Sequence, residues 1–79
     1  MRATVLVRPK PGILDPQGRA VENALQHFGF AVSEARVGKL IDLEVDAPDA
    51  AHARAEVERM CAQLLANPLV ESYEIEVAG

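Results

Sequence analysis

Apolar and polar residues alternate along three segments of the chain, and a period of two predicts β-strands. The segments are Ala3–Val7, Leu40–Asp46 and Val70–Val77. Each segment would present one apolar face. In the first segment this face consists of Ala3, Val5 and Val7, and in the second of Ile41, Leu43 and Val45. In the third it consists of Tyr73, Ile75 and Val77. A further strand, with poorer alternation, is predicted over Ala31–Val37, and a turn at Gly38-Lys39 would join it to the following strand as an antiparallel hairpin.

Two segments with helical spacing separate these strands. Asp15 is suited to cap a helix and Pro16 to begin it, which predicts a first helix over Pro16–Phe28 with Gly29 as its C-terminal residue. Its apolar face would contain Val21, Ala24, Leu25 and Phe28. A second helix begins near Asp49 and ends before Asn67-Pro68, with an apolar stripe of Ala50, Ala53, Val57, Met60, Cys61, Leu64 and Leu65.

The resulting order, β-α-β-β-α-β, predicts an α+β ferredoxin-like fold in which two helices cover one face of a four-stranded antiparallel sheet. Residues 1–79 would form a single domain. The opposite sheet face would stay open, with Leu6, Val32 and Leu40 among charged residues. Such a face suits either solvent or a polar subunit interface.

The length of 79 residues allows only a thin core, so a further source of stability is expected. The single cysteine, Cys61, excludes an internal disulfide and favours a cytoplasmic location. His27 and His52 lack neighbours at metal-site spacing. Oligomerisation is therefore the expected additional source of stability. No apolar run is long enough to suggest a membrane partner.

Charge and motifs argue against several functions. The net charge is -4, from 8 basic and 12 acidic residues, and the basic residues are scattered, so nucleic acid is not an expected partner. Cys61 lies on an apolar stripe and is expected to be a core thiol. The loop Pro9–Gly12 has too few glycines for a phosphate loop. We expect no catalytic, cofactor-binding or metal-binding residue, and a subunit interface among Leu6, Asp15, Gln17, Val32, Arg36, Lys39 and Leu40.

Several segments together resemble the PurS family, the small subunit of phosphoribosylformylglycinamidine synthase. The first is Leu14-Asp15-Pro16-Gln17-Gly18, followed by Val37-Gly38-Lys39. The resemblance is densest at Met60-Cys61, Leu64–Pro68 and Val70-Glu71, with Tyr73 and Glu76. It covers essentially the whole chain. The loop Pro9–Gly12 departs from the family pattern because of its prolines, which leaves its conformation open.

The resemblance implies a ferredoxin-like, non-catalytic subunit of a purine-biosynthesis ligase. The whole enzyme would use ATP and Mg²⁺ on a large synthetase subunit and take nitrogen from glutamine on a glutaminase subunit. The small subunit would join the two, support ammonia transfer and form a homodimer or a dimer of dimers.

One alternative is a regulatory module that binds an amino acid between paired ferredoxin-like domains. It would need a glycine-bearing loop whose backbone N–H groups bind the ligand. Gly12 is a candidate, but the prolines beside it lack N–H groups.

Overall fold

The computed structural model describes residues 1–12 and 15–78, and in this part the order of elements is β-α-β-α-β. The strands are β1 (Arg2–Pro9), β2 (Lys39–Glu44) and β3 (Glu71–Ala78). They form an antiparallel sheet in the order β2-β1-β3, in which Val5 of β1 lies between Ile41 and Ile75. An α+β fold is confirmed.

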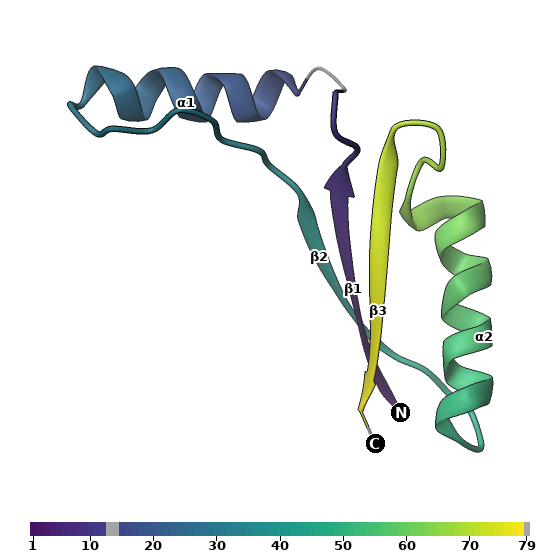
Figure 1. The fold of residues 1–79 in the computed structure, drawn as a ribbon. Helices are drawn as coiled ribbons and strands as arrows, with labels where there is room; N and C mark the ends of the chain where they lie inside the picture. The colour runs from purple at the N-terminus through teal and green to yellow at the C-terminus, as the bar shows by residue number, and fades with distance from the viewer. Residues whose placement is uncertain (13–14, 79) are drawn as a thin grey trace.

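Helix α2 (Ala50–Met60) packs along this sheet, over β1 and β3 (Figure 1). The core between them consists of Ala3, Val5, Val7, Val45, Ala53, Val57, Cys61 and Ala66. The inward face predicted for β1 is therefore confirmed, and the predicted inward residues Ile41, Leu43, Ile75 and Val77 pack against this core as half-buried neighbours. Tyr73 was expected on the same face of β3 but is 38% exposed. Asp49 caps α2 by accepting a 2.9 Å hydrogen bond from the His52 N–H, as the acidic helix start indicates.

The end of the second helix differs from the sequence-based expectation. Residues Cys61–Leu65 form a π-helical turn, in which the Ala66 N–H donates to the Cys61 carbonyl at 3.1 Å. A π-turn inserts an extra residue and shifts the phase of the apolar stripe. Cys61 is buried, as its place on the apolar stripe predicts, and Ala66 is buried five residues later, whereas Leu64 faces solvent and is 83% exposed.

The predicted strand Ala31–Val37 is not part of the sheet, so the four-stranded sheet is wrong for the residues that the structure describes. The predicted hairpin at Gly38 is wrong too. The chain runs past Gly38 into β2 without reversing, and a Cβ atom at Gly38 would overlap the Val7 carbonyl oxygen. Glycine at this position permits a close approach of two backbones rather than a turn.

Helix α1 (Pro16–His27) does not cover the sheet, which is a further correction. Figure 1 shows α1 projecting away from the three strands, with the chain returning beside it toward β2. Within the described residues, Gly18 is the only buried residue of this helix. The apolar spacing correctly predicts a helix, but the helix has no sheet beneath it.

Candidate functional site

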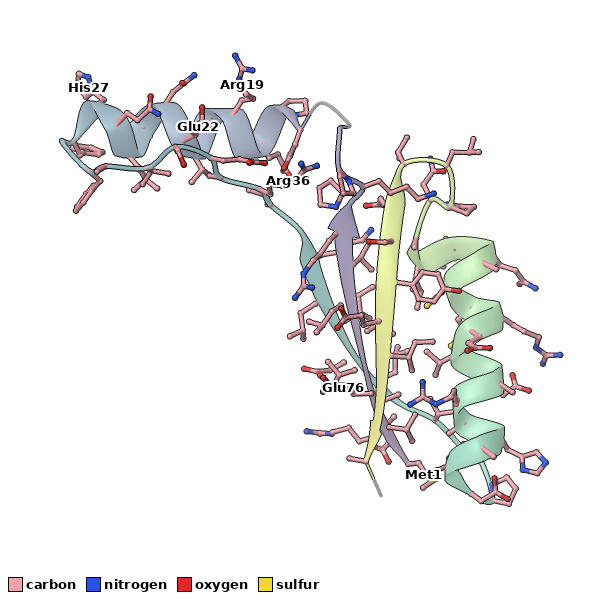
Figure 2. The ribbon with its side chains drawn as sticks, in the orientation of Figure 1. Met1, Arg19, Glu22, His27, Arg36 and Glu76 are labelled. Atoms are coloured by element: carbon pink, nitrogen blue, oxygen red, sulfur yellow. The ribbon has the colours of Figure 1, made fainter. Side chains whose placement is uncertain are left out.

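The most distinctive part of the molecule is a projecting unit that we call the arm, defined as residues 15–37. It contains α1 and the segment 28–37, which runs back along the helix to the sheet. Figure 2 shows His27 toward the far end of the arm and Arg36 at its base, whereas Met1 and Glu76 lie toward the other end of the sheet. The arm therefore extends from one end of the strands.

Asp15 fixes the base of the arm by joining the start of α1 to the end of the returning segment. Its carboxylate accepts hydrogen bonds from the N–H groups of Gly18, at 3.0 Å, and Val37, at 2.8 Å. The Val37 bond, followed by the Gly18 bond, lowers the pKa of Asp15 below its ordinary value of 3.8. The predicted helix cap is confirmed, and it has a second role that spans 22 residues of sequence.

Close backbone packing and further hydrogen bonds hold the segment against the helix. A Cβ atom at Gly18 would overlap the Ala35 carbonyl oxygen, so glycine permits this approach. Farther along, the Gln26 side chain donates to the Val32 carbonyl at 2.7 Å, and the Phe30 N–H donates to the Leu25 carbonyl at 3.0 Å. The helix and the segment therefore project as one connected unit.

The arm exposes large apolar side chains. Phe28 is 75% exposed and Phe30 is 60% exposed, and Val21 is exposed to a smaller extent, at 42%. Single exposed apolar residues are ordinary, but a group of them on a projecting element indicates a surface that another protein covers. Phe28 was expected on a buried helix face, and Phe30 was not among the predicted interface residues.

A hollow of about 430 Å³ lies where the arm joins the sheet. Leu6 and Leu40, which are cross-strand neighbours, contribute apolar surface to it. Its basic residues are Arg8, Arg36 and Lys39. The Arg36 guanidinium donates to the Lys10 carbonyl at 2.8 Å, and Arg8 lies 3.3 Å from the Glu74 carboxylate. This basic, partly apolar hollow stands out on a chain of net charge -4.

The structure brings together four of the predicted interface residues, Leu6, Arg36, Lys39 and Leu40, at this hollow. Asp15 lies at the base of the arm, and Gln17 is exposed in the first turn of α1. Val32 is half-buried on the returning segment rather than on the open sheet face. Whether any of these residues contacts a partner stays a prediction.

The remaining reactive side chains are not gathered into one site. Burial, and to a lesser extent the carboxylate of Glu58, raises the pKa of the Cys61 thiol. The His52 imidazole Nδ1 lies 2.8 Å from the exposed Asp49 carboxylate, beside the cap of α2. Among residues 1–12 and 15–78, no group of His, Cys, Asp and Glu side chains is arranged to hold a metal ion. No described helix is long and apolar enough to cross a bilayer.

Comparisons with known proteins agree with the resemblance seen in the sequence. The model of the PurS family, described as Phosphoribosylformylglycinamidine (FGAM) synthase, matches residues 2–79. The chain is 45% identical to phosphoribosylformylglycinamidine synthase subunit PurS of Synechocystis, over 95% of this chain and 76% of that protein. It is 42% identical to the subunit of the same name from Methanocaldococcus jannaschii, over 96% and 93% of the respective chains.

Solved structures show that the overall shape is shared. Bacillus subtilis PurS superposes with a TM-score of 0.88 at 37% identity, covering 99% of this chain and 98% of that one. A chain of the structure named PurLQS from Thermotoga maritima gives a TM-score of 0.85 at 36% identity, covering 95% and 93%. The family model and the relatives match almost the whole chain, including the arm and the sheet with its covering helix. This chain therefore belongs to the PurS family of phosphoribosylformylglycinamidine synthase subunits.

Proposed function

We propose that this chain joins the glutaminase subunit of phosphoribosylformylglycinamidine synthase to its ATP-dependent synthetase subunit and supports the passage of ammonia between them. ATP and Mg²⁺ would act on the synthetase subunit, glutamine would react on the glutaminase subunit, and this chain would bind neither cofactor. The assembly would be cytoplasmic, as the single thiol favours.

The observation that carries the proposal is the exposure of large apolar side chains on a projecting, hydrogen-bonded arm, above all Phe28 and Phe30. Aromatic side chains, including phenylalanine, are enriched in the buried cores of protein interfaces. The likeness to a chain of PurLQS from Thermotoga maritima, whose name joins three Pur subunits, supports a role in an assembly of the same type.

We also propose that the chain associates with itself, as a homodimer or a dimer of dimers. The buried core contains only small and medium-sized side chains, the largest of which are Val5, Val7, Val57 and Cys61. A core of this size gives a domain little stability on its own. Covering the exposed residues of the arm with another copy would bury additional apolar surface and stabilise both copies.

Reconstitution of the three subunits, assayed with glutamine and with free ammonia, tests the joining role. We expect omission of this chain to abolish most of the glutamine-dependent rate and to spare much more of the ammonia-dependent rate. Bulk ammonia does not have to pass between subunits, whereas ammonia released from glutamine does. Equal glutamine-dependent rates with and without the chain would contradict the proposal.

Matched variants show whether the arm is the surface that joins the other two subunits. Phe28→Ser removes a large exposed apolar side chain from the arm, and Leu64→Ser removes a comparably exposed one from the end of the second helical segment. We expect the Phe28 variant to lower the glutamine-dependent rate at limiting concentrations of this chain. The Leu64 variant should behave as the wild type. The reverse order would place the joining surface at the other helix.

A further inference from the structure

We infer that the open face of the sheet is a second surface of self-association, on which two copies of this chain pack face to face with their strands reversed. The inference rests on the self-association proposed above and identifies a surface for it outside the arm. A dimer of dimers needs two different contact surfaces, and the arm supplies only one of them.

The open face is the side of the sheet that carries Leu6 and Leu40. Helix α2 packs on the other side and α1 projects away, so no helix within residues 1–12 and 15–78 covers this face. Figure 2 shows Glu76 on the uncovered side of the strands. Leu6 and Leu40 are cross-strand neighbours in the middle of the face, and Leu40 is 58% exposed. An exposed apolar pair surrounded by polar residues is typical of a small protein interface.

The charged residues of the open face are separated by sign along the strands. At the end nearest the arm, Arg8 lines the hollow to which Arg36 also contributes. The opposite end holds three carboxylates on the cross-strand neighbours of Arg2 and Thr4, namely Asp42, Glu44 and Glu76. Arg2 offsets only one of these negative charges. The face therefore has a basic end and an acidic end, with the two leucines between them.

Reversing a second copy over the first brings unlike charges together. A twofold axis that lies between the sheets, perpendicular to the strands at Leu6, would set Leu6 and Leu40 against the same residues of the other copy. Two residues from Leu6, Arg8 of one copy would then lie over Thr4 of the other, between the carboxylates of the acidic end. Glu74, beside Leu6, would face its own counterpart, but Arg8 lies 3.3 Å from it and offsets its charge. The contact is isologous, so each favourable pairing occurs twice and the association closes.

The hollow at the basic end is suited to receive carboxylates of the second copy. Gly38 lines the hollow and has no side chain to fill it. Counted from Leu40, the same axis places Asp42 of the second copy over Gly38, and Glu44 of the second copy toward Arg36. A face of one sign would fit an unrelated partner of opposite charge. This face carries both the charges and their complements, which fits a second copy.

Charge reversal with rescue by mixing tests the contact. Arg8→Glu and Glu76→Arg each place like charges opposite one another at both symmetric positions. We expect either variant alone to raise the dissociation constant of the step that uses this face about tenfold, since exposed ion pairs contribute little singly and two are reversed. An equimolar mixture of the two variants should restore the wild-type constant, because each substituted side chain then faces an opposite charge. A change confined to the folding of one chain would not be rescued in this way.

Matched controls separate the open face from other surfaces. Arg54→Glu makes the same change of charge at an exposed position of α2, on the far side of the sheet, and should leave the constant unchanged. Leu40→Glu should abolish the contact, because it puts a charge at the centre of the apolar pair. Leu64→Glu, at a more exposed leucine outside this face, should not.

Sedimentation equilibrium of the full chain measures these constants. We expect the wild type to form an assembly of four copies that Arg8→Glu and Glu76→Arg each reduce to two. Wild-type association that neither variant changes would overturn this inference and leave the self-association intact. Weakened association that mixing does not restore would also overturn it. A wild-type chain that stays monomeric would contradict the self-association itself.

Discussion

Asp15 shows how one side chain decides the direction of a whole element. Its carboxylate accepts from the first turn of α1 and from Val37, where the returning segment approaches β2. A sequence pattern reveals the first contact, because Asp-Pro is a common start of a helix. The second contact depends on where residue 37 lies in space, so no local pattern could predict it.

The charge of Asp15 should make the stability of the fold depend on pH. The folded state lowers its pKa below 3.8, so the fold favours the charged carboxylate. That contribution is complete above the ordinary pKa and is lost as the pH falls through the lower folded-state value. We expect Asp15→Asn to destabilise the protein at pH 7 and the difference from wild type to shrink below about pH 4.

Chemical denaturation at a series of pH values measures this effect. Asp46→Asn, at an exposed position outside the arm, is the control and should show a smaller difference at neutral pH. A constant gap between Asp15→Asn and wild type down to the acid limit of folding would contradict the proposed role of the carboxylate.

Cys61 is expected to act through packing alone. It is fully buried between the sheet and α2, and burial raises the pKa of its thiol, which keeps the thiol protonated and unreactive. Cys61→Ser should lower the free energy of unfolding by about 1–3 kcal/mol, since it places a hydroxyl in an apolar site. Thermal or urea denaturation measures the loss. Fast labelling of the native wild-type thiol by a bulky reagent would contradict its burial.

At the scale of elements, α1 is a helix that has no sheet against its apolar face among the described residues. Its apolar spacing is clear, and from that spacing we predicted a buried face against the sheet. Spacing indicates which side of a helix avoids water, but not which surface covers it. Asp15, Gly18 and Gly38 direct the arm away from the sheet, so that face stays open in a single chain.

Gly18→Ala tests whether close packing holds the arm together. Alanine favours an isolated helix over glycine by about 1 kcal/mol, so intrinsic propensity alone predicts a gain in stability. A Cβ atom here would instead overlap the Ala35 carbonyl oxygen and the Asp15 carboxylate. We expect a net loss of about 1–3 kcal/mol from overpacking, measured by thermal denaturation. Ala20→Gly, on the exposed part of the same helix, should show only the propensity cost. A more stable Gly18→Ala protein would contradict the packing.

At the scale of the whole molecule, the chain is extended, with principal dimensions of 50, 25 and 14 Å. One end holds the core under α2, and the other end is the arm (Figure 1). Phe28 and Phe30 of the arm are exposed. Because a single chain of this shape buries little apolar surface, the self-association proposed above would be the main source of added stability.

The midpoint of thermal unfolding should therefore rise with protein concentration, since association stabilises only the folded state. Calorimetry over a hundredfold range of concentration checks this, and Phe28→Asp together with Phe30→Asp should flatten the dependence. Leu64→Asp is the control, since Leu64 is exposed outside the arm. A midpoint that is independent of concentration in the wild type would contradict self-association.

The sequence by itself determined the three strands of the sheet, their inward faces apart from Tyr73, both helices and their capped starts. These features depend on local physics: a period of two or of 3.6 residues, a cap that accepts N–H bonds, and proline at a first helical position. It also determined the family, because motifs in a fixed order occur over the full length.

Only the tertiary structure decided that residues 31–37 leave the sheet, that α1 projects and that the helix after Met60 changes pitch. Each of these outcomes depends on contacts between residues far apart in the chain, such as Asp15 with Val37 and Gly38 with Val7. Apolar alternation shows that a segment can pair as a strand. Long-range contacts direct the backbone, and they decide which sheet edge, if any, such a segment can reach.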